Sequence, residues 1–122
     1  MTVETEKIET NPIFPKGARL IVWTSKTCGP CQAMKKKKVP EGLAAYYVLP
    51  LQYIDVETPL GEELSDRFEI HALPTVQVVI GDDGESSRPV LAEFEGSGNL
   101  KECIQVILES FEDKKTSAEF EE

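Results

Sequence analysis

Hydrophobic and polar positions along the chain follow two different periods, and these periods predict the order of the elements. Short runs rich in β-branched and aromatic residues indicate strands, whereas apolar residues at every third or fourth position indicate helices. The predicted strands cover 18–23, 51–56, 75–80 and 90–94, and the predicted helices begin at Cys28, Pro59 and Leu100. The order strand, helix, strand, helix, strand, strand, helix predicts an α/β fold with a central mixed sheet of about four strands flanked by helices.

Proline and threonine positions define where two of these helices begin and end. Pro30 falls in the first turn of the first helix, where a missing N–H costs nothing, and Pro40 should end or kink that helix. Residues 41–49 are apolar and are compatible with a further helical turn. Thr58 followed by Pro59 predicts the N-cap and first position of the second helix.

The two ends of the chain are more polar than its middle. Residues 1–12 are acidic with few apolar positions, which predicts a flexible arm. The apolar stripe of the last helix ends at Phe111, and residues 113–122 are expected to form an acidic disordered tail. The domain itself is predicted to span 13–112.

Composition narrows the class of protein. A chain of 122 residues supports one hydrophobic core, and its net charge of -9 argues against nucleic acid or an anionic membrane as partner. No apolar run has the length needed to cross a bilayer, and the polar N-terminus does not resemble a secretion signal. We therefore expect the protein to be cytoplasmic, where thiols are kept reduced. We also expect it to be a monomer.

The segment Cys28-Gly29-Pro30-Cys31 follows an apolar strand and opens a helix. In a reducing compartment such a pair indicates redox or metal chemistry rather than a disulfide framework. Backbone N–H groups and the helix dipole favour a thiolate on Cys28, and the thiolate is the attacking species in thiol–disulfide exchange. The sequence therefore predicts a dithiol–disulfide oxidoreductase with Cys28 and Cys31 as catalytic residues, a redox-active disulfide and no bound cofactor.

Together with the segment Ile70-His71-Ala72-Leu73-Pro74-Thr75, which precedes a predicted strand, this pair resembles the thioredoxin family. The resemblance implies that Pro74 is cis and lies beside Cys28, and that Leu73 offers backbone groups to an extended substrate. The substrate groove that it implies comprises Gly29, Pro30, Leu73, Pro74, Thr75 and Gly96. The implied partners are protein disulfide substrates and an electron donor, either a thioredoxin reductase or glutathione.

Four positions depart from the thioredoxin pattern. Val22 stands where the family has a buried acidic residue, and Leu51 is nearest to the position of its lysine partner, a pair taken to assist proton transfer at the resolving cysteine. Thr27 replaces the tryptophan before the first cysteine, and Lys36 replaces a helix proline.

The N-terminal strand–helix unit of the family is reduced or absent, which gives the core an outline similar to glutaredoxin. Lys26 and the loop 96–99 loosely resemble the glutathione contacts of that family. A glutaredoxin-like, glutathione-dependent reductase is therefore one alternative. A thioredoxin-fold interaction subunit with idle redox chemistry is another, because a fold does not determine a function.

Two other features have competing interpretations. A zinc site needs four ligands, and only His71 and Cys103 remain beyond the pair, with Cys103 on the apolar stripe of the last helix, so no metal site is predicted. The run Lys35–Lys38 is either a solvated helix end that complements the dipole or a basic surface that docks acidic partners.

Overall fold

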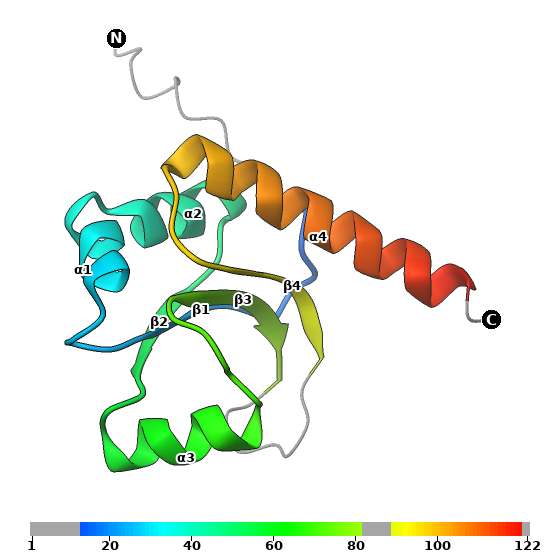
Figure 1. Cartoon of the computed structure of the whole chain (residues 1–122). Helices are drawn as coiled ribbons and strands as arrows, with labels where there is room; N and C mark the ends of the chain where they lie inside the picture. The colour runs from blue at the N-terminus through cyan, green and yellow to red at the C-terminus, as the bar shows by residue number, and fades with distance from the viewer. Residues whose placement is uncertain (1–12, 82–88, 121–122) are drawn as a thin grey trace, which may run out of the picture.

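The computed structural model describes residues 13–81 and 89–120, with side chains up to 114. Within these ranges one sheet contains β1 (Ala18–Thr24), β2 (Leu51–Asp55), β3 (Thr75–Ile80) and β4 (Val90–Glu95), in the order β2-β1-β3-β4 (Figure 1). β1 pairs parallel with β2 and antiparallel with β3, and β3 pairs antiparallel with β4. This is the mixed four-stranded sheet that the sequence predicts.

Helices cover both faces of the sheet (Figure 1). α1 (Gly29–Lys36), α2 (Val39–Tyr47) and α4 (Leu100–Phe120) lie on one face, and α3 (Pro59–Arg67) lies on the other. Successive residues of β1 alternate between the two resulting cores, with Val22 in the larger cluster and Trp23 in the smaller. Burial on both faces explains why residues 20–23 of β1 form a continuous apolar run.

The first predicted helix ends at Lys36, before Pro40, as expected. Residues 41–49 form more than a further turn, however, because α2 is a nine-residue helix with Pro40 near its start. Leu43 and Tyr47 from this helix are almost fully buried in the larger core, and this tertiary burial stabilises the helix.

The last helix is longer than the sequence predicts. α4 continues to Phe120, so residues 113–120 are helical where an acidic disordered tail was expected. The predicted arm over 1–12 and residues 121–122 lie outside the described residues. In the described part of the chain, no helix is both long and apolar enough to cross a membrane.

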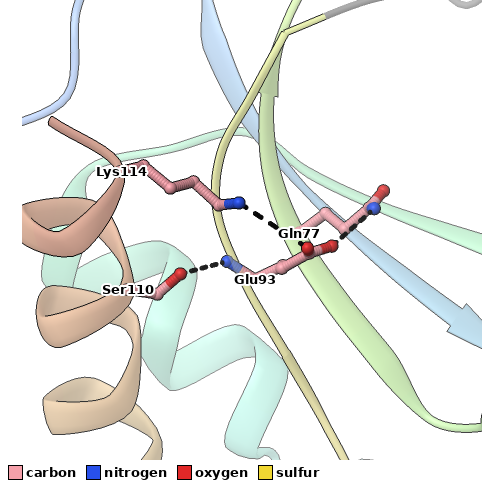
Figure 2. A network of polar contacts seen from close by, with 4 residues as sticks. All are labelled: Gln77, Glu93, Ser110 and Lys114. Atoms are coloured by element: carbon pink, nitrogen blue, oxygen red, sulfur yellow. Dashed lines mark hydrogen bonds and ion pairs between the residues drawn. The ribbon is translucent and has the colours of Figure 1, made fainter. Parts of the chain in front are cut away.

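Polar contacts join β4 to the second half of α4 (Figure 2). The backbone N–H of Glu93 donates to Ser110 Oγ at 2.9 Å, and Lys114 Nζ lies 3.7 Å from Glu93 Oε2. Glu93 Oε1 in turn accepts a hydrogen bond from Gln77 Nε2. Gln77 is buried in β3 and accepts from Trp23 Nε1 at 2.9 Å, so α4 is connected to the centre of the sheet.

Candidate active site

Three segments that the sequence singles out meet at one end of the sheet. In the strand register Trp23 is opposite Thr75, and Thr75 is opposite Glu95. The loop into α1 therefore leaves the sheet beside Pro74, which precedes Thr75, and Pro74 in turn lies beside Gly96, which follows Glu95 on the next strand. The N–H of Gly96 donates to the carbonyl of Pro74 at 2.8 Å, which joins two of the predicted groove segments.

The backbone at Pro74 has the conformation that the resemblance implies. The Leu73–Pro74 peptide bond is cis, as the resemblance implies. Pro74 is fully buried, Leu73 is partly exposed, and the hydroxyl of Thr75 donates to the carbonyl of Ala72 at 2.6 Å. Gly96 has a φ of 94°, a conformation that favours glycine at this turn.

The two cysteines form a disulfide across the first turn of α1, with their Cα atoms 5.3 Å apart. Cys28 is the N-cap and is partly exposed, whereas Cys31 is only 2% exposed. The N–H of Cys31 lies 3.2 Å from Cys28 Sγ and donates to it. Gly29 and Pro30, between the cysteines, are exposed. In the dithiol form a thiolate on Cys28 would lie at the positive end of the helix dipole, with one N–H already directed at it.

A group next to this pair was missed by the sequence analysis. Glu57 Oε2 accepts hydrogen bonds from Ser25 Oγ and Thr27 Oγ1, each at 2.6 Å. These two bonds hold the pKa of Glu57 below its usual range. Ser25, Thr27 and Glu57 meet because β1 and β2 are parallel neighbours. The loops that follow Thr24 and Asp55 therefore leave the sheet at the same end of the strands. That topology was predicted, but nothing in the sequence specifies which side chains of the two loops would pair.

Position 22 is buried and apolar, whereas the thioredoxin pattern has an acidic residue there. Val22 is 2% exposed and packs within the larger core cluster. Thr24, on the same face of β1, is also buried, and its hydroxyl has no hydrogen-bond partner among the described residues.

The remaining candidate ligands are not arranged for metal binding. Cys103 is 3% exposed within the larger core cluster, where burial and, to a smaller extent, Glu102 raise the pKa of its thiol. His71 is exposed. No group of three or more His, Cys, Asp or Glu side chains in the described part of the chain could hold a metal ion.

The lysine run follows the active-site helix. Lys35 and Lys36 lie in the last turn of α1, where they complement the helix dipole. Lys35 Nζ also lies 5.0 Å from the centre of the Tyr53 ring. A cavity of about 270 Å³ between α1 and the loop before α4 is lined by Ala33, Met34, Lys37, Ser97, Gly98 and Asn99. Docking of acidic partners on the exposed lysines stays a prediction.

Comparison with solved structures identifies the fold. The chain is similar to a Plasmodium falciparum thioredoxin, with a TM-score of 0.59 and 20% identity over 90% of this chain and 82% of that one. It is also similar to chloroplastic thioredoxin z, with a TM-score of 0.54 and 20% identity over 89% of each chain. A thioredoxin variant from Halobacterium salinarum gives a TM-score of 0.57 and 23% identity over 78% of this chain and 75% of that one.

Neither a family model nor a curated protein matches the sequence. The similar solved structures show that the chain has the thioredoxin fold, and it carries a close cysteine pair that fits an active site of the CxxC type.

Proposed function

We propose that the protein is a thiol–disulfide oxidoreductase that reduces protein disulfides through a Cys28–Cys31 dithiol/disulfide cycle. The observation that carries this proposal is the disulfide at the start of α1, which joins a partly exposed cysteine to a buried one. Such a pair gives the two cysteines different roles, because we propose that Cys28 meets the partner protein while Cys31 reacts only with Cys28.

The proposed cycle begins with the dithiol. The Cys28 thiolate attacks one sulfur of the target disulfide, and the other target sulfur leaves as a thiolate. The resulting mixed disulfide is attacked by Cys31, which has lost its proton, so that the Cys28–Cys31 bond forms and the second target sulfur leaves. Two electrons pass to the target, and a thioredoxin reductase or glutathione would return two electrons to the pair.

The groove segments supply the proposed substrate contacts. We propose that an extended target segment lies along the partly exposed Leu73, which is next to the loop into α1 in the strand register, and that the buried Pro74 and Thr75 hold the backbone of Leu73 in place. Gly29 and Pro30 on one side and Gly96 on the other would bound this segment. Gly29 carries no side chain that could obstruct a partner.

A second candidate is a thioredoxin-fold interaction subunit in which the redox chemistry is idle. The buried Val22 favours it, because the position that carries a proton-transferring acid in the thioredoxin pattern is apolar here. The two candidates differ in whether function depends on the cysteines.

Reduction of insulin disulfides under dithiothreitol tests the first candidate. We expect wild type to accelerate the reaction and Cys28→Ser to lose the acceleration. A wild-type rate no higher than that of dithiothreitol alone would contradict general disulfide reduction. An interaction subunit would instead keep its function when both cysteines are replaced by serine.

A further inference from the structure

A single carboxylate oxygen joins the loop that carries Cys28 to the loop between β2 and α3. Glu57 Oε2 accepts from both Ser25 Oγ and Thr27 Oγ1 at 2.6 Å, the short distance typical of hydroxyl–carboxylate bonds. The N–H of Thr27 donates to Ser25 Oγ at 3.1 Å, so the two hydroxyl residues are also connected to each other.

The same loop is connected to the nucleophile through Ser25. The carbonyl of Ser25 accepts from the N–H of Cys28 at 3.2 Å and from Gln32 Nε2 at 2.8 Å. Ser25 is 4% exposed, so its position is fixed by packing as well as by these bonds. A continuous path of hydrogen bonds therefore runs from Glu57 through Ser25 to the backbone of Cys28.

The carboxylate of Glu57 is hydrogen-bonded to the residue that precedes the nucleophile. Thr27, which contacts the carboxylate, is the residue directly before Cys28. Lys26, in the same loop, partly offsets this negative charge, and Asp55 Oδ1 accepts the N–H of Glu57 from the end of β2. A nearby carboxylate disfavours a thiolate, and a destabilised dithiol form makes a disulfide harder to reduce.

We propose that Glu57 is a positioning residue for Cys28 which, through Ser25 and Thr27, holds the nucleophile loop and makes the Cys28–Cys31 disulfide harder to reduce. The proposal rests on the redox function proposed above. In this protein the carboxylate beside the nucleophile loop is the exposed Glu57, whereas position 22 in the core is apolar.

The test is the equilibrium of the pair with glutathione at pH 8, measured in wild type and in Glu57→Gln. Glutamine keeps an oxygen that can accept from the two hydroxyls but removes the charge. We expect the equilibrium to move about threefold toward the dithiol, which corresponds to about 14 mV at 29.6 mV per tenfold change. The pKa of the Cys28 thiol, read from the pH dependence of its alkylation, should fall by about half a unit.

Two further variants serve as a control for the lost charge and as a test of the positioning role. Glu62→Gln removes an exposed carboxylate from the first turn of α3 and should leave both values at wild type. A double variant, Ser25→Ala with Thr27→Val, keeps the carboxylate but cuts the path, and should slow alkylation of Cys28 about threefold at a pH where the thiol is ionised.

An unchanged equilibrium in Glu57→Gln, or an equal shift in Glu62→Gln, would overturn the proposal. An unchanged alkylation rate in the double variant would overturn its positioning part. Both measurements use glutathione and a small alkylating reagent, so they stand even if the insulin assay fails. Failure of the proposed function and failure of this inference can therefore be distinguished.

Discussion

Cys28 and Cys103 both lie at the start of a helix, yet the structure gives them opposite environments. Cys28 is the N-cap of α1, is partly exposed and is bonded to Cys31. Cys103 is in the first turn of α4, where its N–H donates to the carbonyl of Asn99, but its side chain is buried in the larger core. Proximity to a helix N-terminus is thus insufficient for reactivity, because access and desolvation decide whether a thiolate can form and reach a partner.

The largest expected effect is on turnover. Cys28→Ser should lower the rate of insulin reduction at least about 100-fold, because a hydroxyl is not ionised at neutral pH. Cys103→Ser should keep the rate within about twofold of wild type after correction for the folded fraction. Initial rates at equal concentration of folded protein measure both. Comparable losses in the two variants would mean that the buried thiol takes part in the reaction.

The rate of alkylation by a small reagent should differ between Cys28 and Cys103 in the absence of any protein substrate. In the reduced protein at pH 7, we expect Cys28 to react with iodoacetamide at least about 100-fold faster than Cys103, as followed by mass spectrometry of peptides. Because burial raises the pKa of Cys103, its labelling should still increase with pH where the labelling of Cys28 has levelled off. Equal labelling rates would show that the core around α4 opens readily.

A carboxylate placed in the larger core cluster should destabilise the folded protein. Val22→Asp introduces a carboxylate into the cluster that also contains Cys103, and should lower the free energy of unfolding by about 2–4 kcal/mol at pH 7. Burial raises the pKa of such an aspartate, so the destabilisation should develop as pH rises above about 4 and be smaller below it. Denaturant unfolding at pH 4.5 and pH 7 measures this, and Val22→Ala controls for the lost volume.

The smallest effect concerns the buried thiol itself. Cys103→Ser should cost about 1–3 kcal/mol of stability because a hydroxyl needs a hydrogen bond that the apolar cluster does not supply. In the dithiol form Cys28→Ser should cost less than about 0.5 kcal/mol, since serine is a good N-cap residue. Urea unfolding under reducing conditions compares the two variants, and an equal cost would contradict the difference in burial.

The parts of the site that follow from local patterns were predictable. The cysteine pair, the proline at position 74 and the glycine at position 96 each stand beside a strand whose period is clear, and the sheet order places them together. The contacts of Glu57 were not predictable, because they join side chains 30 and 32 positions apart across two irregular loops. The length of α4 was missed because the apolar stripe that predicts the helix stops at Phe111, and the sequence after Glu112 is polar.

The bond from the Glu93 N–H to Ser110 has a practical consequence for protein engineering. An edge strand with unpaired N–H groups can pair with another chain, and here the hydroxyl of Ser110 in α4 accepts a hydrogen bond from one such N–H group of β4. A truncated variant that ends before Ser110 would expose the edge of β4 and should aggregate. One that ends just after Lys114 would keep the cover in place, which makes that position the earliest suitable junction for a C-terminal fusion.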